Sequence, residues 1–347
     1  MKCDDHAIEW LLRSQDPAVR YLTLTDLLNA PLRSHQVVAA RRAIADGARV
    51  RALLAGQGAG KQKSKSFGTH PGGFGVHPYK KWNGAHWRLV SLVELGVTRD
   101  VRARAAADQV LMWLTSDKHR ARIKKISGRT RRCASQEGNA LAVCSRLGMT
   151  DDPRVRYLAR ALVEWQWDDG GWNCDVNPRA HHSSFYESLA PLWGLVEYSG
   201  VTQDREAWRA ADRAAEFFLR HRLFRSEKTG EVIERAWLKL HYPLYYHYDI
   251  LQALVILARA GKVRDPRVCD ALDIVESKRQ PDGTWHAEAF YWKPISQARS
   301  NVDVLDWGRS GANEMITLNA LRVLKAAGRV EQNTICIAYI DTLNAAN

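Results

Sequence analysis

Four side chains with metal-binding chemistry lie close to the expected starts of helices. Two are thiols, Cys133 and Cys174, and two are imidazoles, His182 and His247. Thiolates and neutral imidazoles are ligands that Zn²⁺ prefers, and a catalytic zinc keeps one position open for water. Such an ion lowers the pKa of its bound water to about 7 and polarises a carbonyl or phosphoryl oxygen. The residues therefore suggest zinc as a cofactor. The alternative is that the thiols are buried small residues and the histidines satisfy helix ends.

Carboxylates accompany these groups. In the segment Tyr245–Asp249, an imidazole, a carboxylate and three phenols precede an apolar stretch. Carboxylates gathered in an apolar site have raised pKa values, as a general acid requires. For Asp249 two hypotheses stay open: it accepts hydrogen bonds from the first turn of its own helix, or it transfers a proton together with His247. The candidate catalytic residues are Asp249, His247, Glu187, Glu314 and Tyr186.

Aromatic side chains are frequent in the same parts of the chain. As a group they favour a cavity for an apolar or aromatic small molecule, where ring faces also stabilise positive charge. Taken singly, each is equally typical of a core residue at a helix end. The candidate substrate-binding residues are Trp82, Trp87, Phe185, Tyr248 and Trp307, with Arg179 for an anionic group.

A repeated junction indicates which elements position these residues. Glycines stand at positions 96, 148, 200, 261 and 328, and an acidic residue follows each within a few positions. Glycine closes a helix in the left-handed conformation, and Asp caps the next helix. Apolar helices are expected before the glycines, over residues 86–95, 138–147, 183–198, 245–260 and 312–327. Amphipathic helices are expected after them, over 101–114, 154–165, 205–219, 267–278 and 332–343.

An N-terminal pair, over residues 17–28 and 36–54, brings the number of helix pairs to six. Alternating buried and amphipathic helices predict an all-α protein. The expected architecture is a single (α/α)6 toroid, or barrel, that forms one domain over residues 1–347, with an open solenoid as the alternative. Long connections join the pairs at the N-terminal ends of the inner helices, so function is expected at that mouth.

Composition narrows the partners. The chain has a formal net charge of +13, with basic runs at Lys61–Lys65 and Lys118–Arg132. These runs fit solvated loops or a rim that attracts an anionic substrate. No sequence signature of a nucleic-acid-binding module accompanies them, which disfavours nucleic acid as a partner. An apolar run long enough for a membrane span is missing, and neither the N-terminus nor the scattered cysteines indicate export. We therefore expect a cytoplasmic protein.

Two segments resemble the QW repeats of squalene–hopene cyclases. Residues 166–172 read QWDDGGW and match Q-x3-G-x-W, whereas residues 279–285 read RQPDGTW and have Arg279 in place of the Gln. With the six helix pairs, the chain resembles the terpenoid cyclase and protein prenyltransferase toroid superfamily. Strings such as GGWNCD and YHYDIL resemble bacterial squalene-cyclase-like proteins of undefined activity. In that superfamily the QW repeats are structural staples, and fold alone does not fix the reaction.

The chain departs from both branches of that superfamily. It lacks the DxDD proton donor of triterpene cyclases. Against the prenyltransferase zinc triad, Ala180 falls where Asp is expected, His182 where Cys is expected, and Asn313 or Glu314 near the His. The leading expectation is an enzyme for acid/base or zinc-assisted cleavage or rearrangement of a largely apolar substrate. The first alternative is terpenoid cyclisation or isoprenyl diphosphate transfer, and the second is a non-catalytic ligand-binding toroid.

Overall fold

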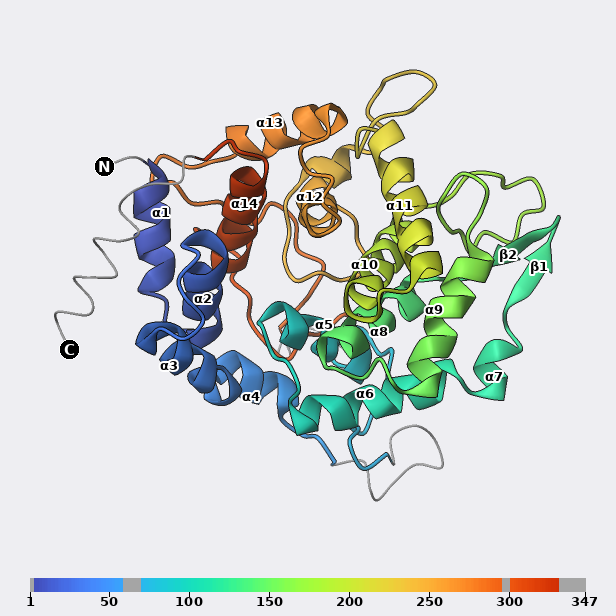
Figure 1. The fold of residues 1–347 in the computed structure, drawn as a ribbon, viewed down its shortest axis with the longest axis horizontal. Coiled ribbons are helices and arrows are strands. Elements are labelled where there is room, and N and C mark those ends of the chain that lie inside the picture. Colours follow the sequence, from blue (N-terminus) through green and yellow to red (C-terminus); the bar gives the residue numbers. More distant parts are fainter. Residues whose placement is uncertain (1–2, 59–69, 295–299, 331–347) are drawn as a thin grey trace.

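The protein is mainly helical, as expected (Figure 1). The structure, a computed structural model, describes residues 3–58, 70–294 and 300–330. The expected helix over residues 332–343 and the basic run Lys61–Lys65 lie outside the described residues. None of the described helices combines the length and the apolarity that a membrane span needs.

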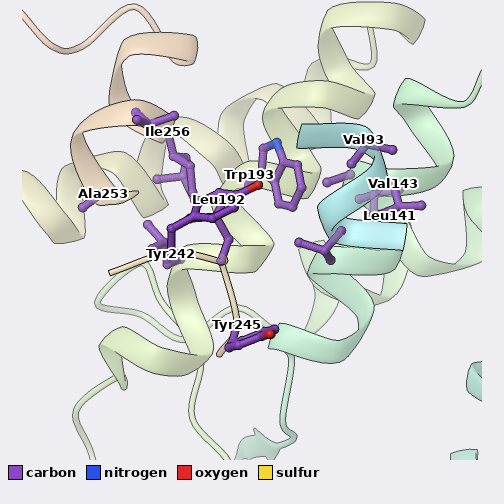
Figure 2. Close-up of a cluster of buried hydrophobic side chains, with 14 of the residues drawn as sticks. Val93, Leu141, Val143, Leu192, Trp193, Tyr242, Tyr245, Ala253 and Ile256 are labelled. Atoms are coloured by element: carbon purple, nitrogen blue, oxygen red, sulfur yellow. The ribbon is translucent and has the colours of Figure 1, made fainter. Parts of the chain in front are cut away.

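Five apolar helices form an inner series. They are α5 (Ala85–Glu94), α8 (Ser135–Arg146), α10 (Phe185–Thr202), α12 (Ile250–Arg259) and α14 (Glu314–Ala326). Each of them contacts the next one in the chain. Every residue of α5 is buried, as expected for a helix covered on most sides. Side chains from this series, among them Val93, Leu141, Trp193 and Ile256, meet in one hydrophobic core (Figure 2).

Amphipathic helices follow four of these in sequence and cover them from outside. They are α6 (Val101–Leu114), α9 (Pro153–Trp165), α11 (Arg205–Arg220) and α13 (Cys269–Ser277), the last preceded by the short 3-10 helix η6 (Pro266–Val268). The predicted caps are confirmed: each of these segments begins after an Asp whose side chain accepts a hydrogen bond from a first-turn N–H group. These caps are Asp100, Asp152, Asp204 and Asp265.

The glycine junctions are confirmed at four of the five positions. Gly96, Gly148, Gly261 and Gly328 have φ values of 80°, 69°, 72° and 76°, the left-handed region that ends a helix. The prediction for Gly200 is wrong, because α10 continues through it to Thr202. There Gln203 takes the left-handed conformation with φ 59°, and its side-chain amide donates to the Gly200 carbonyl.

The N-terminal region is more broken than the sequence suggests. The first expected helix consists of α2 (Pro17–Leu22) and a π-helical turn η1 (Thr23–Leu27). The second is divided at Gly47, whose ψ of 143° interrupts the helix. Its parts are α3 (His35–Ala43), the 3-10 turn η2 (Ile44–Asp46) and α4 (Ala48–Leu54).

Several small elements were not expected. Helix α1 (Cys3–Leu12) precedes the first pair, and the basic run Lys118–Arg132 contains most of α7 (Asp117–Arg120) and a hairpin. The hairpin pairs β1 (Lys124–Ile126) with β2 (Arg129–Arg131) in antiparallel register. A 3-10 turn, η5 (Arg235–Leu238), lies in the long connection before α12.

Helices α8 and α10 pack at backbone contact. A Cβ on Gly138 would lie 2.3 Å from the backbone nitrogen of Pro191, and one on Gly194 would lie 2.4 Å from the Gly138 carbonyl oxygen. Because these glycines have no side chain, the N-terminal halves of the two helices approach closely. The candidate site lies at the N-terminal ends of this pair.

Candidate metal centre

Two of the predicted zinc ligands meet beside the N-terminal ends of α8 and α10. The Sγ atoms of Cys133 and Cys174 and a carboxylate oxygen of Glu187 all lie within 4.8 Å of one another. Cys133 is two residues before the first residue of α8, and Glu187 is in the first turn of α10. The backbone N–H of Arg132 donates to the Asn173 carbonyl at 3.1 Å. This bond holds the two cysteine-bearing segments side by side.

Glu187 is held in place from the other helix. Its Oε2 accepts hydrogen bonds from the backbone N–H of Ser135 at 3.0 Å and from the Ser135 hydroxyl at 2.8 Å. Its Oε1 faces the thiol of Cys174 at 3.7 Å. One carboxylate oxygen is therefore fixed by the first residue of α8, and the other is directed at the two sulfur atoms.

The QW-like loop anchors the segment that carries Cys174. The side-chain amide of Gln166 donates to the carbonyls of Gly170 and Ala210, at 2.7 and 2.8 Å. The buried Trp172 donates from its indole nitrogen to the Leu162 carbonyl at 3.0 Å. Asp169 accepts from the backbone N–H of Ser183 at 2.7 Å. These contacts connect α9, α11 and the start of α10, which is the stapling role that the sequence suggested.

A buried charge cluster supports the other segment. The guanidinium of Arg132 donates to Glu137 at 2.9 and 2.7 Å, and it also reaches His119. Because Arg132 is more than nine-tenths buried, its pairing with Glu137 fixes the backbone next to Cys133. His119 and Arg132 belong to the basic run Lys118–Arg132, which the sequence suggested as solvated loop or rim, but both are buried. Their spacing from Glu137 matches no metal or catalytic motif.

The three clustered groups have perturbed acidities. A hydrogen bond to Cys174, together with burial, raises the pKa of the Cys133 thiol. The same hydrogen bond lowers the pKa of Cys174. Burial raises the pKa of Glu187, against the opposing effect of the Ser135 hydrogen bonds. The arrangement thus favours ionisation of Cys174 over Cys133, and a positive ion would stabilise the anionic forms of all three groups.

The donor set fits a zinc ion. Zn–S bonds of about 2.3 Å and Zn–O bonds of about 2.1 Å bring ligand atoms in a tetrahedral site to about 3.5–3.8 Å from each other. The observed limit of 4.8 Å requires a contraction of about 1 Å, and both cysteines lie outside helices, where such an adjustment is easy. Two sulfurs and one oxygen leave a fourth position open, which is the pattern of catalytic rather than structural zinc.

The two predicted histidine ligands are not part of this group. His182 is exposed, its ring lies 4.0 Å from that of His181, and its carbonyl accepts from Asn173. His247 stacks on Tyr291 with ring centroids 3.6 Å apart. The sequence suggested that each histidine begins a helix. Neither does, because α10 starts at Phe185 and α12 at Ile250. The third member of the group is Glu187, which the sequence suggested as a catalytic acid.

The position of Asp249 also differs from the expectation. It is the N-cap residue of α12 rather than a residue one turn inside the helix, and it is fully buried. Its carboxylate accepts from the backbone N–H groups of Gln252 at 2.8 Å and His241 at 2.9 Å. The His241 ring nitrogen Nδ1 lies 2.7 Å away. Asp249 is therefore paired with His241, which the sequence analysis missed because Pro243 and an irregular segment separate them.

A small cavity adjoins the cluster. Its volume is about 30 Å³, room for one or two water molecules. Ser135, which holds Glu187, lines it together with Tyr186, His247 and Gln252. Tyr186 accepts a hydrogen bond from the indole of Trp237 at 3.1 Å. Burial, with the nearby His241 and Lys81, lowers the pKa of His247 to about 4, so this imidazole is neutral at pH 7.

The remaining candidates lie elsewhere or pack among other side chains. Trp82 stacks on Tyr245 at 3.9 Å, with Trp87 edge-on at 4.8 Å. Phe185 and Tyr248 are in mutual contact in the core, and the Tyr248 hydroxyl donates to the Leu223 carbonyl. The following three lie in other surroundings: Trp307 donates to Asp303, Arg179 is on an exposed turn, and Glu314 pairs with Arg49.

No protein-family model matches the chain, and no curated protein matches it.

Proposed function

We propose that the helix pairs close into the (α/α)6 toroid, with the series α5, α8, α10, α12 and α14 on the inside. Two observations support closure. Helix α14 contacts α2 and η1 at the other end of the chain. Gly96, which follows α5, lies close to α2: a Cβ placed on it would be 3.6 Å from the side chain of Leu22. The sixth inner position is thus taken by α2 and η1, between α14 and α5.

We further propose a zinc-dependent enzyme that acts on a small molecule with an apolar or aromatic part. The observation that carries this proposal is the convergence of Cys133, Cys174 and Glu187. The adjoining cavity of about 30 Å³ is lined by aromatic residues and would have to widen to admit the substrate. Reduced thiols are needed as ligands, which agrees with a cytoplasmic location. The reaction class is cleavage or rearrangement at a carbonyl or phosphoryl group, since those are the groups that zinc polarises.

The chain supplies the other functional groups around that position. Bound zinc would provide a Lewis acid and lower the pKa of a coordinated water. Glu187 is oriented by Ser135, so one of its oxygens remains directed at the sulfurs. The neutral imidazole of His247 can accept a proton, and the hydroxyl of Tyr186, which accepts from Trp237, can donate its own proton to a substrate oxygen. The aromatic lining would exclude water from the reacting groups.

Elemental analysis of the purified protein tests the proposal. We expect about one zinc per chain, lost in Cys133→Ser and Cys174→Ser and retained in Cys269→Ser. Cys269 is an exposed cysteine outside the cluster and is the matched control. Equal zinc content in all variants, or none in the wild type after purification with added zinc, would refute the site. A protein that binds zinc and small molecules but converts none of them would be a ligand-binding toroid.

A further inference from the structure

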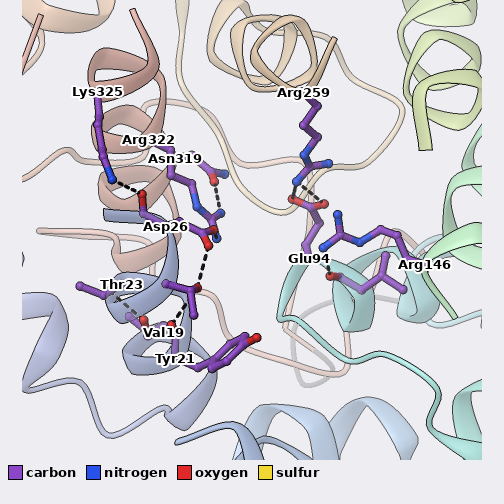
Figure 3. Close-up of polar contacts among 12 residues, drawn as sticks. Val19, Tyr21, Thr23, Asp26, Glu94, Arg146, Arg259, Asn319, Arg322 and Lys325 are labelled. Carbon is purple, nitrogen blue, oxygen red and sulfur yellow. Dashed lines mark hydrogen bonds and ion pairs between the residues drawn. The ribbon is translucent and has the colours of Figure 1, made fainter. Parts of the chain in front are cut away.

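The C-terminal ends of the inner helices carry a second polar cluster. The candidate metal centre lies at the other, N-terminal ends of these helices. The polar cluster contains three arginines and three carboxylates in or near the last turns of the inner elements. The members are Asp26 of η1, Glu94 of α5, Arg146 of α8, Glu197 of α10, Arg259 of α12 and Arg322 of α14. All of them except Glu197 are labelled in Figure 3, where Arg322 lies with Asp26 and Arg259 lies with Glu94.

Ion pairs connect these groups across the molecule. Arg259 donates to both oxygens of Glu94, at 3.0 and 3.3 Å, and Arg146 pairs with Glu197 at 3.0 Å. Burial alone would raise the pKa of Glu94, but Arg259 and Arg146 outweigh it and hold this pKa below its usual value. The carboxylate is therefore ionised, and the charges of the cluster persist at neutral pH.

All of these residues except Glu197 line a cavity between the inner helices. Its volume is about 610 Å³, within the range of small-molecule sites. Its charged lining has four arginines and two carboxylates: Arg41, Arg146, Arg259, Arg322, Asp26 and Glu94. Apolar side chains of α12 and α14, among them Val255, Ala258 and Val323, line another part of the wall. The cavity thus combines an excess of guanidinium groups with an apolar surface.

Three guanidinium nitrogens in this cluster lack a hydrogen-bond acceptor within the described part of the chain. They are Nε of Arg146, Nη1 of Arg259 and Nε of Arg322, and each is inaccessible as an atom. Nη1 of Arg259 has only a distant ion-pair contact with Glu197, at 3.6 Å. A buried N–H group without an acceptor is costly. Because these nitrogens are inaccessible, an anion in the cavity would instead contact the exposed parts of the same side chains, which are 23%, 22% and 15% exposed in Arg146, Arg259 and Arg322.

Helix dipoles give a simpler reason for arginines at this end. Cations near a helix C-terminus are stabilised by about 0.3–1 kcal/mol each. That effect accounts for the residue type and its position. It accounts neither for the unfilled donors on three different helices nor for a cavity of about 610 Å³ between them.

We propose that this cavity binds a small organic anion with one carboxylate or phosphate group and an apolar body. The anionic group accepts hydrogen bonds from Arg146, Arg259 and Arg322, and the apolar body lies against Val255 and Ala258. The site is separate from the zinc centre and does not depend on the function proposed above.

Isothermal titration calorimetry of the full chain with octanoate and with octyl phosphate tests the proposal. We expect saturable binding of at least one probe below about 1 mM, weakened by added salt because the contact is ionic. Octanol, which has the same apolar body and no charge, is the control and should bind at least about tenfold more weakly. The two anionic probes separate a carboxylate ligand from a phosphate ligand.

Single substitutions locate the site. Ala258→Phe fills the cavity, whereas Ala260→Phe adds the same ring two residues away, where Ala260 lines a different depression. We expect the first to abolish octanoate or octyl phosphate binding and the second to retain it. Arg322→Gln should weaken binding at least about tenfold, since a charge-assisted bond is lost. Circular dichroism melts show whether each variant is folded.

The wild-type comparison keeps the proposal falsifiable even if a variant does not fold. If neither anionic probe binds below about 1 mM, or if octanol binds as tightly as they do, the cavity is not an anion site. Retained binding in a folded Ala258→Phe variant would overturn the proposal as well.

Discussion

At the scale of single residues, the feature with the clearest chemistry is the perturbed acidity of Cys133, Cys174 and Glu187. Zinc binds thiolates and carboxylates, so Cys133 and Glu187 must both be deprotonated in the metal-bound state. The pKa values of both groups are raised in the folded protein. The folded, metal-free protein therefore holds protons that the metal displaces.

Zinc affinity should accordingly increase with pH. We expect the dissociation constant, measured by competition with a chelator between pH 6 and 8, to fall at least about tenfold per pH unit, the slope for one proton released per ion. Calorimetry in buffers of different ionisation enthalpy counts the protons directly. A dissociation constant that does not change over this range would mean that the thiols are not the ligands.

Two histidines should make the folded state sensitive to acid. Burial lowers the pKa of His86 to about 3, and burial with neighbouring positive groups lowers that of His247 to about 4. The unfolded chain, with ordinary histidine pKa values of about 6.5, binds more protons than the folded chain below that pH. Stability should therefore decrease as the pH falls from about 6.5 toward 4.

Urea denaturation at a series of pH values checks this prediction. The midpoint should fall with pH in the wild type and fall less in His247→Gln, which has no titrating ring. His182→Gln is the control, because His182 is exposed. A wild-type midpoint that is constant down to pH 4 would show that neither histidine is held neutral by the fold.

At the scale of elements, the contact between α8 and α10 determines where Glu187 meets the cysteines. Alanine at Gly138 of α8 would place a Cβ 2.3 Å from the backbone of α10. A Cβ on Gly200 of α10 would have nothing within 4 Å. Gly138→Ala should lower the free energy of unfolding by about 1–3 kcal/mol through overpacking. Gly200→Ala should raise it by up to about 1 kcal/mol, since alanine is the better helix former.

Thermal melts of the two alanine variants give the comparison. Gly138→Ala should also lose zinc, because separation of the helices moves Glu187 away from Cys133. Equal stability in both variants would show that the helices have room to separate at Gly138.

Much of the element order could be predicted from the sequence, and the reasons are local. Asp100 and Asp152 are caps whose function depends on neighbouring backbone N–H groups, so their position in sequence is sufficient to place a helix start. Tyr245–Asp249 was assigned to a helix because apolar residues continue through it. In the structure the Asp249 cap fixes the start of α12 at Ile250 instead.

The site was only partly predictable for the opposite reason. Cys133 and Cys174 were recognised because both stand just outside expected helices. The third member depends on how α8 and α10 pack at Gly138, and that distance has no signature in the local sequence. The Asp249–His241 pair likewise results from an irregular connection around Pro243, which periodicity does not describe.

At the scale of the whole molecule, the N-terminal helices are held to the last described helix by polar contacts. Glu314, the first residue of α14, accepts from the Ser14 hydroxyl at 2.6 Å and from Arg49 at 2.7 Å. Lys325, near the end of α14, donates to the carbonyls of Asp26 and Leu27 at 2.8 Å. The two ends of α14 are thereby fixed to segments nearly three hundred residues earlier.

This arrangement gives Glu314 a structural role, which is an alternative to the catalytic one that the sequence suggested. Glu314→Gln keeps the shape of the side chain but removes the charge that faces Arg49. We expect a loss of about 1–2 kcal/mol, because the pair is partly buried and charge-assisted. Amide hydrogen exchange in α2 and α14 should accelerate, since their contact loosens first. Zinc content should stay at the wild-type level, because Glu314 is not in the group of Cys133, Cys174 and Glu187. If the variant instead keeps its stability and its exchange pattern but loses zinc or turnover, Glu314 belongs to the active site and the closure of the helix series must depend on other contacts.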